Sequence, residues 1–550
     1  MAISQKSGLR TLLSGIVKRP QTLFLLLTIA AGAYTLWPLH DFQNYLAQGD
    51  HGRDLYCFKK VMDGAVPYRA FSWLFGPLMP YYYSIFYHLG GVSIQSVLFG
   101  QGLLILLTGV FIYLACAVFF TPAASFACAL WYWGFRGTEF FYTYNHSGGL
   151  LALIAALYCL FLYIRDSRTR PAYGGFACLF LLAMVRLNMG LVIMAGYTLS
   201  LILSDFVLKN PRAPKQRVLF AGLFFSVTGA VLLVYWLLLY PLPDYAIQQS
   251  FPYAKSQRVD YSGSLISVLQ YSWHLFYTYF TATAAQKIFG ALILLAAGKT
   301  VHLIYSKTLP QGRGKRLGLA LLSLFVFTIC GAHEFIASGV FYRIAWILPL
   351  VYITIFFIIT TATGNIRSAP VKLLIITTLL FPSLMNIRRE HFLISQYKNP
   401  AHYLNIGNNR IYTTQDPSWF QTVYQTTAFI KQNIPPGDTV LVLPLDPLYL
   451  FLGERDSAAR QLVFFEHFHI PSEQERATIA EMENNRGNWA IISNRSVTLE
   501  GGMGVFGETY CPLLSQYLED HFTEVAKFGD WANPPGWAWN HGVKVLKRTR

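Results

Sequence analysis

Acidic side chains are scarce in the apolar N-terminal part of this chain, so those that occur there are the first candidates for chemistry. Residues 1–387 contain only ten Asp and Glu residues. Four of these gather within residues 39–92: Asp41, Asp50, Asp54 and Asp63. A partly desolvated carboxylate within hydrogen-bond reach of a hydroxyl group can accept its proton. The cluster therefore predicts general-base catalysis in this segment.

Two arginines stand near predicted external turns. Arg186 lies in "AMVRLNMGLV", and Arg343 lies in "GAHEFIASGVFYRIAWILP". A guanidinium group binds phosphate through paired N–H donors, so both arginines are candidate phosphate ligands. A structural arginine that snorkels or forms an ion pair is the alternative. His333 and Glu334 fit a solvated turn equally well; we include His333 among the candidate substrate contacts.

The sequence contains no strong motif for a metal site or a disulfide. The sequence has no HExxH motif, no Cys/His ligand spacing and no DxD motif in the expected external loops. We therefore predict no cofactor, although the sequence does not exclude a divalent ion. Most of the seven cysteines fit buried structural thiols, and Cys57 and Cys511 are the one plausible external pair.

The elements that must position these residues are mainly membrane spans. The chain is 54% hydrophobic and only 13% charged, and several apolar runs reach the roughly 20 residues needed to cross a bilayer. Basic clusters at 6–19, 165–170, 209–217, 307–316 and 367–372 are expected on the cytoplasmic side. About eleven spans satisfy every cluster: 21–38, 93–119, 122–137, 143–164, 171–185, 189–208, 217–240, 286–305, 317–335, 341–363 and 370–387. An odd number places the N-terminus in the cytoplasm and the C-terminal region outside.

The requirement that every basic cluster lies on the cytoplasmic side leaves one apolar segment out of the membrane. Counting residues 75–91 as a span would put the cluster at 165–170 on the wrong side, so we predict a helix lying at the external interface. Residues 39–92 and 241–285 then form the two large external loops, and the candidate base lies in the first of them.

The net charge of +16 does not indicate nucleic-acid binding. Residues 1–387 hold 28 basic and 10 acidic residues, whereas the remainder holds 15 and 17, so the excess lies in the membrane part. No clustered basic face is visible, and a nucleic-acid partner is not predicted.

Beyond residue 387 the composition becomes that of a soluble domain. Residues 435–446 predict a turn and a buried strand, residues 472–485 a helix capped by Ser472, and residues 488–494 a second strand. We therefore divide the chain into a transmembrane domain, 1–387, and an extracytoplasmic α/β domain, 388–550.

One run in the first loop carries a resemblance to a known superfamily. "GRDLYCFKKVMDGAVPYRAFSWLFGPLMPYYY" (residues 52–83) resembles the first-loop signature of the GT-C glycosyltransferases, which include protein O-mannosyltransferases and aminoarabinose transferases. The resemblance implies an all-α polytopic membrane domain with a small C-terminal α/β domain. It also implies an inverting transferase that takes a monosaccharide from a polyprenyl-phosphate carrier to a glycan, lipid or protein acceptor outside the cytoplasm. A bacterial inner membrane is the location that it suggests.

The resemblance also implies roles for particular residues. Asp54, in "GRD", occupies the place of the base, and Asp50 is its nearest competitor for that role. We also count Asp50 and Arg53 among the candidate substrate contacts. Arg186 and Asn188 match a "K.N.G" arrangement that would bind the carrier phosphate, and Glu139 would orient the sugar or acceptor beside Asp54. The chain departs from the pattern at Ala70, where relatives often have Asp.

Each of these roles has a structural alternative. Asp54 fits the N-cap of a helix that begins near Leu55. Glu139 fits an ion pair with Arg136, and Asp63 before Gly64 fits a turn. For the whole chain, a transporter or flippase of a lipid-linked sugar and a sugar polymerase or ligase are the alternatives.

Overall fold

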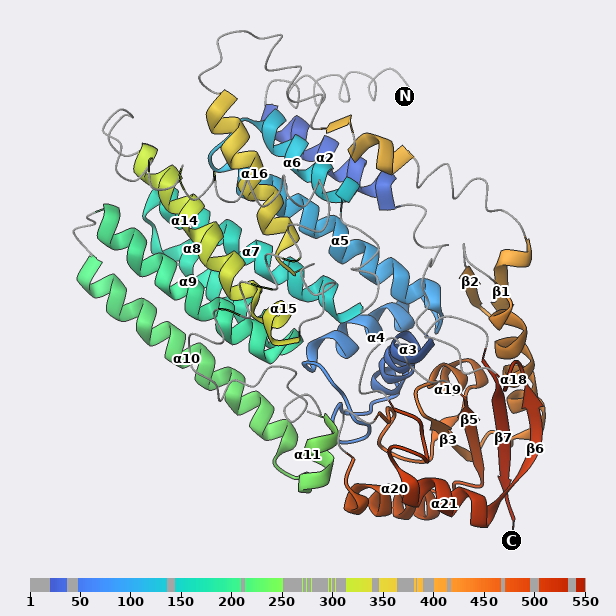
Figure 1. Cartoon of the computed structure of the whole chain (residues 1–550). Coiled ribbons are helices and arrows are strands. Elements are labelled where there is room, and N and C mark those ends of the chain that lie inside the picture. Colours follow the sequence, from blue (N-terminus) through green and yellow to red (C-terminus); the bar gives the residue numbers. More distant parts are fainter. Residues whose placement is uncertain are drawn as a thin grey trace, which may run out of the picture.

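The protein is a helical bundle with a small α/β region at one end (Figure 1). The computed structural model describes residues 20–36, 48–135, 144–208, 213–250, 313–338, 346–363, 383–388, 400–412, 417–465, 470–494, 504–532 and 541–549, with a few isolated positions between them. The helical α3 and α4 segments lie between the bundle and the α/β region (Figure 1).

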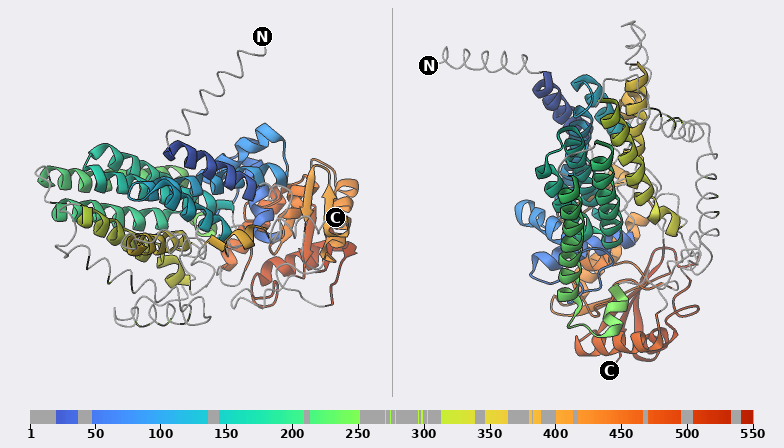
Figure 2. Two further views of the ribbon diagram at one scale, coloured as in Figure 1. Left: turned by 90° about the horizontal axis from the view of Figure 1, so that it is seen from above. Right: turned by 90° about the vertical axis from the view of Figure 1, so that its left-hand side faces the viewer.

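The bundle is built from long apolar helices that lie side by side (Figure 2). They are α2 (Pro20–Leu36), α5 (Ile94–Ala117), α6 (Pro122–Phe135), α7 (Tyr144–Asp166), α8 (Thr169–Val185), α9 (Leu187–Leu208), α10 (Ala213–Leu239), α14 (Arg313–Gly331) and α16 (Leu348–Thr363). Within the described residues, five of these, α5, α7, α9, α10 and α14, are long and apolar enough to cross a membrane. Nine of the eleven predicted spans overlap a helix of this set. The other two, 286–305 and 370–387, fall largely outside the described residues, so the number of spans stays a prediction.

The surface of the bundle is apolar where a soluble protein would be polar. Helix α10 exposes Val218, Phe225 and Trp236, whereas α7 is largely buried among its neighbours. Several large apolar side chains exposed along one helix are typical of a surface that contacts lipid or another apolar partner. With the length of the helices, this identifies an integral membrane protein.

Two shorter helices precede the bundle, α3 (Gln48–Met62) and α4 (Leu78–Gly90). The 13 residues of α4 rise only about 20 Å, which is too short for the hydrocarbon core. It exposes Tyr81, Ile85 and Leu89 at helical spacing on one face. Within the described residues, α4 is not among the helices long enough to cross a membrane, and its exposed apolar face agrees with a place at the membrane surface. The prediction that residues 75–91 do not form a span stays a prediction.

The C-terminal region contains a five-stranded mixed sheet. Its order is β4 (Asp456–Ser457), β3 (Thr439–Leu443), β5 (Trp489–Ser493), β7 (Val543–Arg548) and β6 (Phe522–Phe528). Strand β3 runs parallel to β4 and β5, and β7 is antiparallel to β5 and β6. The other elements are η5 (Pro400–His402), β1 (Tyr403–Ile406), β2 (Asn409–Tyr412), α18 (Trp419–Asn433), α19 (Leu448–Gly453), α20 (Ser472–Asn484) and α21 (Pro512–His521).

The predicted α/β character and both predicted strands are confirmed, and two details are wrong. Ser472 is the first residue of α20, whose N-cap position is occupied by Pro471, so Ser472 does not cap this helix. Cys57 and Cys511 are both buried as free thiols. They belong to separate apolar clusters, so they do not form the expected pair.

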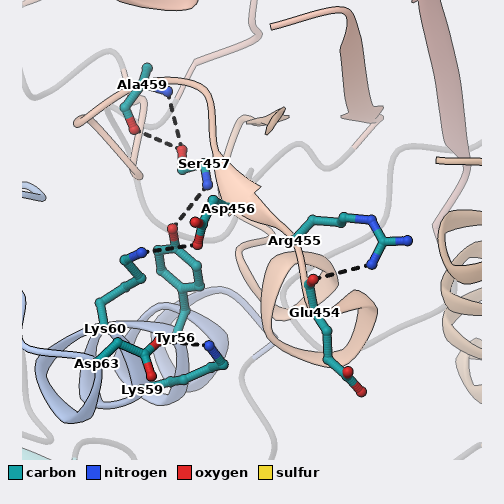
Figure 3. A network of polar contacts seen from close by, with 9 residues as sticks. All are labelled: Tyr56, Lys59, Lys60, Asp63, Glu454, Arg455, Asp456, Ser457 and Ala459. Atoms are coloured by element: carbon teal, nitrogen blue, oxygen red, sulfur yellow. Dashed lines mark hydrogen bonds and ion pairs between the residues drawn. The ribbon is translucent and has the colours of Figure 1, made fainter. Parts of the chain in front are cut away.

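Helix α3 packs closely against the C-terminal region. The Tyr56 hydroxyl accepts a hydrogen bond from the Ser457 backbone N–H (2.9 Å), and Lys60 forms an ion pair with Asp456 (3.0 Å) (Figure 3). A Cβ at Gly52 would lie 2.5 Å from the backbone nitrogen of Leu448 and 2.7 Å from its Cα. Only glycine allows this approach, because the obstacle is backbone and cannot rotate away.

Gly52→Ala is therefore expected to destabilise the protein by about 1–3 kcal/mol, the usual cost of overpacking a close contact. The measurement is the thermal unfolding of the full chain in detergent. Gly102→Ala is the matched control, because a Cβ at Gly102 in α5 would meet no atom within 4 Å. Equal melting temperatures for the two variants would contradict the close docking of α3.

Candidate active site

The candidate base lies in the middle of α3. This helix begins at Gln48, so Asp54 is in its second turn and does not cap it; the capping alternative is wrong. Asp50 and Asp54 are four residues apart and therefore project from the same face. Arg53 reaches both of them. Its Nη1 donates to Oδ1 of Asp50 (2.7 Å), and its Nε and Nη2 donate to Oδ1 of Asp54 (3.0 and 2.8 Å).

The ionisable side chain of Asp54 is fully buried. It is 0% exposed and Arg53 is 1% exposed, whereas the Asp50 side chain is 35% exposed. Burial raises the pKa of Asp54 to about 7, and the nearby Arg53 opposes this shift by favouring the anion. A carboxyl group that titrates near neutrality changes easily between acceptor and donor of a proton, as general-base catalysis requires.

Helix α7 of the bundle also contacts the carboxylate of Asp54. Asn145, in the first turn of α7, donates from Nδ2 to Oδ2 of Asp54 (3.0 Å) and is 2% exposed. The Tyr83 hydroxyl holds the start of α7 by donating to the carbonyl of Tyr144 (2.8 Å). We did not predict Asn145 from the sequence, since a single Asn before an apolar run has no distinctive motif.

Arg186 lies at the break between α8 and α9. Its backbone is extended and ends α8, and the side chain forms an ion pair with the buried Glu334 of α15 (His333–Ser338). Asn188 donates to the same Glu334 carboxylate oxygen (3.1 Å) and lies 3.1 Å from Nε2 of His333. Three predicted substrate contacts, Arg186, Asn188 and His333, are therefore brought together.

One aromatic ring connects the two clusters. The guanidinium carbons of Arg53 and Arg186 lie 5.3 and 5.4 Å from the centroid of Phe75, which are cation–π distances. The loop that carries Phe75 is fixed on α8, because the Gly76 N–H donates to the carbonyl of Val185 (2.8 Å). A Cβ at Gly76 would lie 2.0 Å from the carbonyl oxygen of Met184. Phe75 of the first loop therefore contacts both Arg53, the ion-pair partner of the candidate base, and Arg186, the candidate phosphate ligand.

The remaining predicted positions are either outside the described residues or exposed at the surface. Glu139 and Arg343 lie outside the described residues, so their roles stay predictions. Ala70 is exposed, and the preceding Arg69 donates to the carbonyl of Leu237 (2.9 Å). Position 70 is therefore exposed, in contrast to the buried Asp54.

The described residues do not offer a divalent-metal site at Asp54. They contain no group of three His, Cys, Asp or Glu side chains that converge on one point. Arg53 already donates twice to Oδ1 of Asp54, and a divalent cation at that oxygen would be repelled by the guanidinium charge. Metal independence of the protein nevertheless stays a prediction.

The fold and the buried, arginine-bound carboxylate define a polytopic membrane protein with a candidate active site at one end of its bundle. The sequence matches no family model and no curated protein. The oligosaccharyltransferase of Archaeoglobus fulgidus, solved in complex with Zn and sulfate, superimposes with a TM-score of 0.53 and 14% identity, over 86% of this chain and 68% of that one. The same archaeal enzyme, AglB, in complex with an inhibitory peptide and a dolichol-phosphate also gives 0.53, with 12% identity over 94% and 74%. ArnT from Cupriavidus metallidurans, bound to undecaprenyl phosphate, gives 0.47, with 12% identity over 95% and 97%.

The chain shares the fold of this archaeal oligosaccharyltransferase, which agrees with the first-loop resemblance. At these identities the likeness is one of fold alone. What the protein does must therefore be argued from its own residues.

Proposed function

We propose that the protein is a glycosyltransferase that moves a monosaccharide from a polyprenyl-phosphate carrier to an acceptor on the extracytoplasmic side of the membrane. The observation that carries this proposal is the buried carboxylate of Asp54, held by Arg53 in a GT-C fold and next to the loop that reaches Arg186. The dolichol-phosphate in the archaeal oligosaccharyltransferase supports a lipid-phosphate carrier for this fold.

The chemistry needs one base and a cation. The acceptor hydroxyl attacks the anomeric carbon, its oxygen forms the new C–O bond, and its proton passes to Asp54. The bond between the anomeric carbon and the phosphate oxygen breaks, and the carrier phosphate leaves with the electron pair. That phosphate is stable as an anion, so no second acid is required, unlike the hydrolysis of an ordinary glycosidic bond. Attack from the face opposite to the phosphate inverts the anomeric configuration.

Arg186 is the candidate ligand of the carrier phosphate. Its side chain is 16% exposed, in contrast to the buried Arg53, and its Nε faces Glu334. In the proposed complex, its terminal N–H groups donate to phosphate oxygens. The lipid tail then lies between the spans, and the C-terminal region faces outward, as expected for a protein of a bacterial inner membrane.

The test is direct transfer by the full chain in detergent. Labelled undecaprenyl-phosphate mannose, glucose and aminoarabinose are mixed with methyl glycosides or a membrane extract as acceptor. We expect release of undecaprenyl phosphate and a labelled product with the opposite anomeric configuration, read by NMR. Movement of the lipid across vesicles without transfer would instead favour a flippase, and addition of whole chains of sugar would favour a polymerase or ligase.

A further inference from the structure

The orientation of the Asn145 amide is fixed by its neighbour. An ionised carboxylate can only accept hydrogen bonds, so the amide nitrogen, and not the oxygen, must face Asp54. The observed 3.0 Å contact from Nδ2 to Oδ2 has this orientation, and it joins residues that are 91 positions apart in the sequence. With Arg53 on Oδ1 and Asn145 on Oδ2, both oxygens of the base are held.

The other end of the same amide has an open acceptor. Oδ1 of Asn145 is buried and has no hydrogen-bond partner within the described part of the chain. The residue as a whole is 2% exposed, so solvent around the protein does not satisfy this oxygen. A buried acceptor without a partner destabilises the folded state, and such groups are usually completed by a ligand or a bound water.

The position of Asn145 on its helix favours the anion of Asp54. It lies in the first turn of α7, a helix of 23 residues. The N-terminal end of a helix carries a partial positive charge, which stabilises a nearby carboxylate. The start of α7 therefore supports the ionised base in both charge and hydrogen bonding.

We propose that Asn145 is a further residue of the active site: its Nδ2 positions the Asp54 carboxylate, and its Oδ1 accepts a hydrogen bond from a hydroxyl group of a sugar substrate. This inference rests on the proposed function. The reacting hydroxyl has a single proton, which goes to Asp54, so the group on Oδ1 is a different hydroxyl. It belongs to the transferred sugar or to a carbohydrate acceptor, and Asn145 then recognises a hydroxyl group other than the reacting one.

The first measurement is the pH dependence of kcat for the full chain, with labelled undecaprenyl-phosphate sugars as donors. Asn145→Leu removes the donor to Asp54, so the midpoint of the acid limb should rise by about one to two pH units. Asn145→Asp places a second carboxylate beside the first, so the midpoint should rise further. Ser147→Ala is the matched control, because Ser147 is a buried polar residue of the same helix that is not bonded to Asp54. A purely structural role would lower the amount of folded protein in either variant and leave the midpoint in place.

The second measurement is KM at a pH above every midpoint. We expect Asn145→Leu to raise KM about tenfold, the loss typical of one hydrogen bond. A rise in the KM of the lipid-linked sugar assigns the hydroxyl to the transferred sugar, and a rise in that of a methyl glycoside assigns it to the acceptor. An unchanged midpoint in both variants, or unchanged KM values for both substrates, would overturn the inference while the transferase stands. No transfer by the natural sequence would overturn the proposed function as well, whereas full turnover by Asp54→Asn would move the base to another residue and overturn this inference alone.

Discussion

Asp54→Asn is expected to reduce sugar transfer by roughly 100-fold or more, because the amide keeps the shape of the carboxyl group and cannot accept the acceptor's proton. The measurement is the rate of undecaprenyl phosphate release at saturating donor. Asp63→Asn is the matched control: Asp63 follows the same helix, is exposed and pairs with Lys59 (2.7 Å). We expect that control to transfer at the normal rate. If Asp54→Asn keeps its turnover, the base must be another residue, with Asp50 and Glu139 next to test.

The pH dependence of the same reaction follows from the burial of Asp54. Since burial raises its pKa to about 7, the ionised base is lost as the pH falls below neutrality. The rate should therefore fall about tenfold per pH unit on the acid side and level off above pH 7.

The raised pKa also predicts how stable the Asn variant should be. Because folding favours the protonated form of Asp54, the stability that this group contributes is fully present below its ordinary pKa of 3.8. It is lost as the pH rises through about 7. Asn resembles the protonated form, and Arg53 keeps its ion pair with Asp50, so Asp54→Asn should remain folded at pH 8. A strong loss of stability in this variant would instead indicate that the residue is structural.

Arg186→Ala is expected to weaken binding of the carrier by about 10- to 100-fold, the loss typical of charge-assisted hydrogen bonds to phosphate. Arg186→Lys should recover part of this affinity, because lysine keeps the charge and loses the paired donors. The measurement is the affinity of the detergent-solubilised protein for undecaprenyl phosphate, at low and high salt.

Because Arg186 forms an ion pair with Glu334, the single variant also changes stability. A double variant that removes both charges separates this effect from the loss of carrier affinity. Removing the arginine leaves a buried carboxylate with less compensation, which costs several kcal/mol in typical cases. The double variant Arg186→Ala/Glu334→Gln removes both charges and should restore stability without restoring carrier affinity. Arg69→Ala, an exposed arginine of the first loop that bonds the end of α10, should bind the carrier normally. Restored affinity in the double variant would contradict a phosphate contact at Arg186.

Local signals in the sequence determined much of this protein. Apolar runs of sufficient length predicted the long helices, and alternating or continuous apolar stretches predicted β3 and β5, because each depends on the burial of neighbouring residues along the chain. The positions of the basic clusters predicted that residues 75–91 do not form a span, and the short helix α4 agrees with this prediction. The resemblance of "GRDLYCFKKVMDGAVPYRAF" to a known first-loop signature implied the fold and singled out Asp54 as the candidate base, a role that stays a prediction.

Tertiary structure alone decided how the site is assembled. Helix α3 begins at Gln48, so Asp54 is a mid-helix residue and the alternative that it caps this helix is wrong. The contact of Asn145 with Asp54, the pairing of Arg186 with Glu334 and the shared Phe75 ring join residues that are distant in sequence. Such contacts depend on how separate helices pack, and no spacing along one segment encodes them.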